Sequence, residues 1–101
     1  MQIRANDKKR IVEIAKKCFP FSIEIWAFGS RVKEIAHEGS DLDLVVINKT
    51  KNIGVKSNIQ LFKENLKQSN IPIFVQVFDW DAMPSNYSSE IEKNHQVFFE
   101  S

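Results

Sequence analysis

The sequence predicts an α/β (α+β) domain, in which a small mixed sheet of about four strands carries helices packed on it. Short segments rich in β-branched and aromatic residues predict strands at 23–28, 42–47, 73–78 and 97–99. The segments that alternate with them show apolar residues at helical spacing. No internal repeat and no shift in composition marks a second domain, so residues 1–101 are expected to form one domain.

The first predicted helix begins near Asn6 or Asp7, since either side chain can cap it, and Pro20 ends it. Its apolar face consists of Ile11, Ile14, Ala15 and Cys18. The position of Cys18 on this face predicts a small core residue rather than a nucleophile. The strand at 23–28 stops at a Gly-Ser pair, and a short helix over 31–36 and a loop over 37–40 are expected to follow.

The strand at 42–47 is apolar on both faces near its end, as expected of a central strand. Residues 57–68 form an amphipathic pattern and are predicted to be helical. Ser89 and Glu92 stand at capping-box spacing, which predicts that a short last helix begins there.

Composition excludes several classes of protein. A hydrophobic fraction of 43% with only 3 Gly and 3 Pro argues against disorder and collagen. No apolar run exceeds four residues, so neither a membrane span nor a signal-peptide core is expected. The single Cys cannot build a disulfide framework, and we therefore expect a cytoplasmic protein.

The charges are placed unevenly along a chain whose formal total is only +1. Residues 1–17 carry six basic and two acidic side chains, a net +4, whereas residues 79–101 carry one basic and five acidic side chains, a net −4. The near-neutral total argues against a general nucleic-acid binder. A solvated helix face and an acidic tail explain this pattern most simply, and a partner-binding or phosphate-attracting role is the alternative.

Two short motifs carry the chemistry: Gly29-Ser30-Arg31 at the end of one strand, and Ser40-Asp41-Leu42-Asp43-Leu44 at the start of the next. Residues i and i+2 of a strand point to the same face, so Asp41 and Asp43 should project together. Neighbouring carboxylates repel one another unless a cation lies between them. Mg²⁺ suits this role, because proteins hold it with one or two carboxylates and substrate phosphates.

The Gly-Ser pair supplies features that a phosphate site needs. Gly29 lets the backbone turn sharply and approach a ligand, and Ser30 lies where helix N–H groups can receive phosphate. Arg31 adds a positive charge. Taken singly, Ser30 could merely cap a helix and Asp41 a turn, but together the two motifs indicate a phosphate-plus-metal site.

These motifs and their order resemble the signature of the polymerase-beta-like nucleotidyltransferases, and most closely their minimal nucleotidyltransferase (MNT) domains. The likeness covers nearly the whole chain, including a late strand that ends in Phe78-Asp79-Trp80. It implies a palm-like fold and an antitoxin of the MNT type. Antitoxins of this type pair with a small helical HEPN protein and transfer AMP from ATP to it.

The resemblance also implies roles for individual residues. Gly29, Ser30, Arg31 and Ser40 would contact the triphosphate of ATP or another nucleoside triphosphate. Asp41 and Asp43 would be the catalytic residues and hold Mg²⁺. The HEPN-type partner would form a hetero-oligomer with the chain, and neither a membrane nor a nucleic acid is expected as a partner.

One position departs from the family pattern. The resemblance places a third Asp where this chain has Gln76, which cannot accept a proton and is a poorer metal ligand. In a regular strand, Asp79 and Asp81 would point to the opposite face and could not replace it. The alternative is therefore a weakened or inactive domain that binds nucleotide and neutralises its partner by contact.

Overall fold

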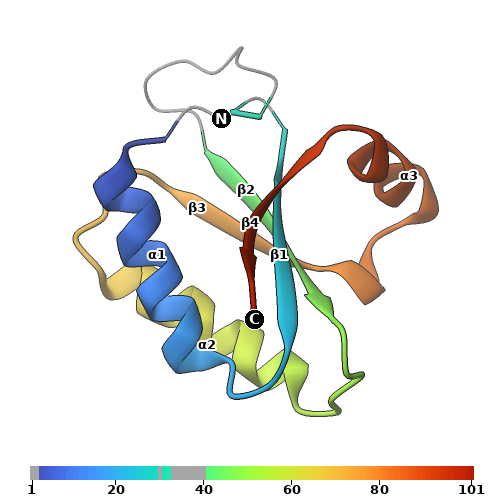
Figure 1. The fold of residues 1–101 in the computed structure, drawn as a ribbon, viewed down its shortest axis with the longest axis horizontal. Coiled ribbons are helices and arrows are strands. Elements are labelled where there is room, and N and C mark those ends of the chain that lie inside the picture. The colour runs from blue at the N-terminus through green and yellow to red at the C-terminus, as the bar shows by residue number, and fades with distance from the viewer. Residues whose placement is uncertain (1–2, 30, 33–40) are drawn as a thin grey trace.

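The computed structural model describes residues 3–29, 31–32 and 41–101 (Figure 1). The elements in these ranges are α1 (Ala5–Cys18), β1 (Ile23–Phe28), β2 (Leu42–Asn48), α2 (Val55–Gln68), β3 (Val75–Asp79), the 3₁₀ turn η1 (Trp80–Ala82), α3 (Ser85–Lys93) and β4 (His95–Glu100). The predicted combination of a small mixed sheet with helices packed on it is confirmed.

The four strands form one sheet in the order β3-β2-β1-β4. β1 runs antiparallel to both β2 and β4, whereas β2 and β3 are parallel and are joined by the crossover helix α2. The prediction of a central strand at 42–47 is confirmed, because β2 lies between β1 and β3 and most of its side chains are buried. This order brings the end of β1 beside the beginnings of β2 and β3.

The helices α1 and α2 cover one face of the sheet, called the helix face below (Figure 1). Their apolar stripes pack on alternate residues of the strands, and Phe62 is fully buried among them. Cys18 is 2% exposed and belongs to this core, as predicted. Burial raises the pKa of its thiol, which is consistent with a packing role.

The opposite face, called the open face below, carries aromatic side chains. The Trp26 ring stacks on His95 with 3.8 Å between ring centroids and meets Trp80 edge-on at 5.3 Å. Strand pairing places Val45 between Trp26 and Phe78, and Val45 is fully buried. Part of the open face is therefore a second, aromatic packing layer.

Two predicted helix starts are wrong. α1 begins at Ala5 after the N-cap residue Arg4 and has no side-chain cap, so neither Asn6 nor Asp7 caps it; both lie in its first turn. α3 begins directly after Pro84, which places Ser89 in the middle of the helix. Proline has no backbone N–H and its φ is fixed, so a helix can start beside it without a capping side chain.

Two other expectations are met only in part. Arg31 and Val32 form a turn, and the rest of the predicted helix over 31–36 lies outside these residues. The third strand begins at Val75, two residues later than predicted, although Leu42 N still donates to Phe74 O at 2.9 Å.

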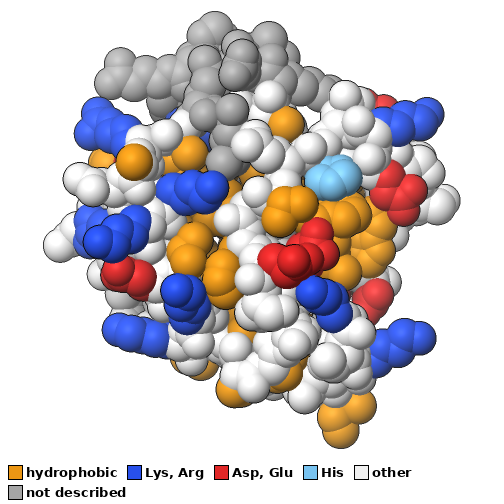
Figure 2. All heavy atoms as spheres, in the orientation of Figure 1, with side chains coloured by type: hydrophobic (Ala, Val, Ile, Leu, Met, Phe, Trp, Pro, Cys, Tyr) orange, Lys and Arg blue, Asp and Glu red, His pale blue; other side chains and the backbone are white. Residues whose placement is uncertain are grey.

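The basic side chains of the amino-terminal segment gather over α1 (Figure 2). Lys9, Arg10, Lys16 and Lys17 are exposed. Lys8 lies 5.5 Å from the centre of the Phe98 ring, which links the basic helix to the acidic end of the chain. No helix in the described part of the chain is long and apolar enough to cross a membrane.

Candidate functional site

The candidate site begins where β1 ends. Gly29 follows Phe28 with φ +82°, in the left-handed region that favours glycine. A Cβ placed on Gly29 would lie 2.5 Å from Oδ2 of Asp43. The backbone at this turn is therefore packed directly against the Asp43 carboxylate, and any larger residue would displace it.

The two predicted carboxylates lie together on the open face. Asp43 pairs with Phe28 of β1 on one side and with Gln76 of β3 on the other. Asp41 precedes β2 and is close enough to interact electrostatically with Asp43. Burial, followed by the Asp41 charge, raises the pKa of Asp43. The prediction that the two acids project together is confirmed.

Gln76 completes this cluster, which we call the Asp41–Asp43–Gln76 cluster. Its Nε2 donates to Oδ2 of Asp41 at 2.6 Å. Its pairing with Asp43 follows from the parallel register of β2 and β3. The alternation of side chains along the strand correctly predicted that Gln76 and Asp79 point to opposite faces. The hydrogen bond to Asp41, however, becomes visible only once the strands are paired.

The nearby acids of the third strand do not replace a carboxylate at position 76. Asp79 pairs with Val46, a residue of the helix face, and its Oδ1 accepts a hydrogen bond from the backbone N of Asp81 at 3.1 Å. Its carboxylate therefore lies on the other face, as the β-alternation predicts, and there it caps η1.

Sequence reasoning missed an aromatic pair beside the acids. The Phe28 and Phe78 rings lie 5.8 Å apart, and strand pairing places Phe28 opposite Asp43 and Phe78 opposite Val45, the next open-face residue of β2. Both side chains are only partly buried. The signal that could have found them is the period-2 alternation, which puts Phe28 with Asp43 and Phe78 with Gln76 once the strand order is known.

Three other predicted nucleotide contacts have different outcomes. Arg31 is 8% exposed, so its side chain is buried near the end of β1 rather than directed into solvent. Ser30 and Ser40 lie outside the described residues. The described part of the site therefore consists of the Gly29 backbone, the two carboxylates and Gln76.

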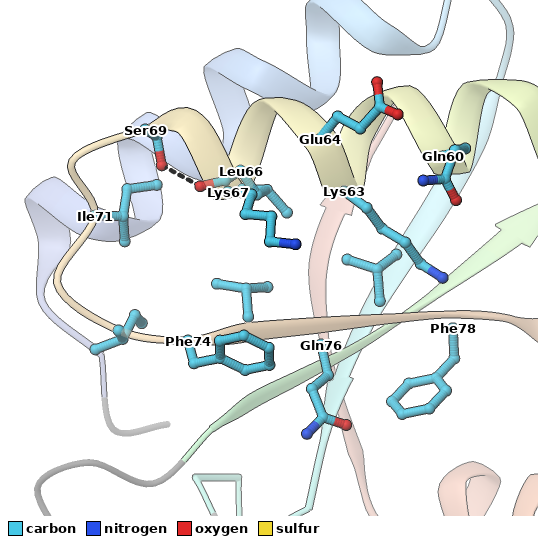
Figure 3. Close-up of a pocket in the computed structure, with 13 residues that line it drawn as sticks. Gln60, Lys63, Glu64, Leu66, Lys67, Ser69, Ile71, Phe74, Gln76 and Phe78 are labelled. Carbon is cyan, nitrogen blue, oxygen red and sulfur yellow. Dashed lines mark hydrogen bonds between the residues drawn. The ribbon is translucent and has the colours of Figure 1, made fainter.

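A groove of about 720 Å³ lies between α2 and the edge strand β3 (Figure 3). Lys63 and Gln60 extend over it from α2, whereas Gln76 and Phe78 project from β3 on the side away from the helix. The groove is not lined by either carboxylate. The candidate site is thus a surface of the open face rather than this groove.

The chemistry of the cluster suits a hard divalent cation. Asp41 and Asp43 offer carboxylate oxygens on one surface, which is the donor type that Mg²⁺ takes together with phosphate oxygens. A glycine turn next to them lets phosphate oxygens approach the backbone closely. The residues present therefore fit a cation that bridges the protein and a phosphorylated ligand.

Comparison with known proteins agrees with this geometry. Residues 9–101 match the family Polymerase beta, Nucleotidyltransferase. The chain is 30% identical over 100 residues to a Haemophilus influenzae protein named probable protein adenylyltransferase MntA, covering 99% of this chain and 85% of that protein.

Solved structures share the fold at low sequence identity. A toxin-antitoxin crystallised with AMP-PNP gives a TM-score of 0.64 at 18% identity, over 93% of this chain and 73% of that chain. A tri-AMPylated Shewanella oneidensis HEPN toxin in complex with its MNT antitoxin gives 0.57 at 13% identity, over 98% and 74%. With the family match over nearly its whole length, this chain belongs to the polymerase beta nucleotidyltransferase family, and it is a homologue of MntA.

Proposed function

We propose that this chain is an MNT-type antitoxin, a Mg²⁺-dependent adenylyltransferase that transfers AMP from ATP to a HEPN-type toxin. The single observation that carries the proposal is the packing of the Gly29 backbone against Asp43, with Asp41 beside it on the open face. We further propose that residues 1–101 act as one minimal nucleotidyltransferase domain in the cytoplasm, in keeping with the free, buried Cys18.

The relatives support the choice of reaction and partner. The Haemophilus influenzae homologue is named a protein adenylyltransferase. The Shewanella oneidensis structure contains an AMPylated HEPN toxin with an MNT antitoxin. We extend both properties to this chain and expect a hetero-oligomer with a small helical HEPN-type protein.

The proposed reaction moves an adenylyl group. An oxygen of an acceptor hydroxyl attacks the α-phosphorus of ATP and forms a new O–P bond. The bond from that phosphorus to the bridging oxygen breaks, pyrophosphate leaves with the electron pair, and the hydroxyl proton passes to solvent. The Gln76 amide cannot accept that proton, so transfer should be slower by about 10²–10⁴-fold than with a positioned base.

Each site residue has a proposed role in this reaction. Asp41 and Asp43 would hold Mg²⁺, which supplies charge neutralisation for the phosphates. The Gly29 backbone, with Ser30, Arg31 and Ser40 as sequence-based candidates, would hold the triphosphate. Burial and the Asp41 charge raise the pKa of Asp43, so nucleotide binding should weaken as the solution becomes acidic.

The direct experiment mixes the chain, ATP and Mg²⁺ with a HEPN-type protein that binds the chain and measures the intact mass of that partner. We expect an AMP-sized gain in mass with the unmodified chain and none with Asp43→Asn. Asp81→Asn is the matched control, because Asp81 is exposed and its side chain lies outside the cluster. No gain in mass with a partner that still binds would contradict the enzymatic function.

A second function is favoured by one observation, the hydrogen bond from Gln76 to Asp41. An amide at this place suits a domain that binds nucleotide and neutralises its partner by contact alone. That function predicts that Asp43→Asn leaves both partner binding and neutralisation intact. The adenylyltransferase predicts that the same variant binds the partner but no longer neutralises it.

A further inference from the structure

Gln76 bears on how many cations the site can hold. Its side chain shares the open face with the two carboxylates, and its Nε2 lies 2.6 Å from Oδ2 of Asp41. An ionised carboxylate only accepts hydrogen bonds, so the amide must present N–H rather than C=O to Asp41. The oxygen of Asp41 that faces β3 therefore already accepts a hydrogen bond from the protein.

A site for two cations needs more anionic oxygen than this cluster offers. Paired metal ions lie about 3.5–4 Å apart, and they need bridging and terminal carboxylates to offset their combined charge. In the described ranges, no group of three or more His, Cys, Asp or Glu side chains could hold a metal ion. Asp79, the nearest acid along β3, belongs to the helix face and caps η1.

Among the described residues, the donor set therefore fits one cation and does not fit two. Asp41 and Asp43 can share a single divalent ion, and the remaining ligands would come from phosphate and water. The Gln76 N–H group places a partial positive charge at Oδ2 of Asp41, which opposes the binding of a second ion to that oxygen. The amide can also keep Asp41 oriented when the site holds no ion.

We propose that Gln76 is a positioning residue that makes this a one-cation site, with its amide N–H taking the place of a second cation at Asp41. The inference concerns the number of ions bound and does not depend on the transfer of AMP or on the identity of a partner. It makes the amide at position 76 a substitute for a metal ion rather than a mere loss of a carboxylate.

The test uses Mn²⁺ alone, with the full chain and without nucleotide or partner. Titration followed by electron paramagnetic resonance counts the bound ions, and the spectrum reports whether two ions are close enough to couple. The unmodified chain should bind one Mn²⁺ with an uncoupled six-line signal. Gln76→Asp should bind two, with the broadened signal of a coupled pair.

Two variants make the result decisive. Gln76→Glu keeps the length of the glutamine side chain and should also bind a second ion, which covers the case in which Gln76→Asp fails to fold. Gln96→Asp is the matched control, because it adds the same charge at an exposed position of the other edge strand. It should bind one ion, like the unmodified chain.

The proposal would be overturned by two coupled ions on the unmodified chain, by no ion on it, or by a single ion on every folded variant at position 76. A second ion on Gln96→Asp would overturn it as well, because added charge alone would then suffice. None of these results bears on whether AMP is transferred, since no nucleotide is present in the titration.

Discussion

The two faces of the sheet use the same strands for different purposes. The helix face buries aliphatic side chains such as Ile23 and Leu44 completely under α1 and α2. The open face carries aromatic rings and, at one end, the partly buried cluster of Asp41, Asp43 and Gln76. At the start of β2, adjacent residues thus alternate between core packing and candidate chemistry.

This contrast teaches that stability and function are separable along one strand. A helix-face residue of β2 contributes by removing apolar surface from water. Asp43, its neighbour, is held near another carboxylate and partly buried, which opposes its ionisation. Substitutions on the helix face should therefore lower stability, and a neutral residue in place of Asp43 should raise it.

The largest expected effect comes from the helix face. Phe62 is fully buried between the helices and the sheet, with an edge contact to Phe19 at 5.5 Å. Phe62→Ala should lower the free energy of unfolding by about 3–5 kcal/mol, because it leaves a cavity in the core. Urea unfolding measures this change.

Phe74→Ala is the control for this prediction, since that ring is 62% exposed. It should change the free energy of unfolding by less than about 1 kcal/mol. Equal losses for both variants would show that the helix face is not the principal source of stability.

The next largest loss of stability is expected at Gly29, where the turn after β1 packs against the Asp43 carboxylate. Gly29→Ala introduces a Cβ 2.5 Å from the Asp43 carboxylate at a φ of +82°. We expect a loss of about 1–3 kcal/mol in the free energy of unfolding, since a left-handed conformation and a steric conflict add together. Gly54→Ala, at a φ of −85°, should cost less, and a larger loss at Gly54 would contradict this assignment.

A smaller change in stability, of opposite sign, is expected when the Asp43 carboxylate is replaced. Folding raises the pKa of Asp43 above its usual value of 3.8. The folded chain therefore binds the proton of the Asp43 carboxyl more tightly than the unfolded chain does. Stability then falls as the pH rises from that value through the raised pKa, and Asp43 is destabilising at pH 7.

Asp43→Asn should therefore raise the melting temperature at pH 7. This gain should shrink toward zero as the pH falls below about 4, where the carboxyl becomes protonated in both states. Thermal unfolding across this pH range measures the difference. A gain that is constant with pH would show that ionisation of Asp43 is not its cause.

The smallest effect belongs to the surface ion pair of the β4 edge. Lys49 Nζ lies 3.5 Å from Oε2 of Glu100, and both side chains are well exposed. Glu100→Gln should lower the free energy of unfolding by about 0.5 kcal/mol or less, and added salt should erase even this difference. A loss above about 1 kcal/mol in high salt would contradict the description of this contact as a weak surface ion pair.

The sequence pattern predicted the strands and the acidic pair because both depend on local periodicity. Ile23–Phe28 forms a strand as predicted, and Asp41 and Asp43 share a face because the period of a strand is two. Helix starts were less predictable, since Pro84 starts α3 without the capping box that Ser89 and Glu92 suggested.

Contacts between strands could not be predicted from either strand alone. The hydrogen bond from Gln76 to Asp41 needs the parallel pairing of β2 and β3, which the crossover helix α2 sets. The ring pair of Phe28 and Phe78 likewise joins strands on either side of β2. Such contacts depend on strand order and register, which arise from the packing of the whole sheet.

The most direct measurement is the melting temperature of the unmodified chain and of Asp43→Asn, each with and without Mg²⁺ and a non-hydrolysable ATP analogue. Ligand that binds only the folded state raises the melting temperature. We predict that the unmodified chain melts lower without ligand and gains stability with it, whereas Asp43→Asn melts higher without ligand and gains little. If Asp43→Asn instead showed the full ligand-induced gain, or melted lower than the unmodified chain in the absence of ligand, the assignment of Asp43 to a nucleotide site on the open face would be contradicted.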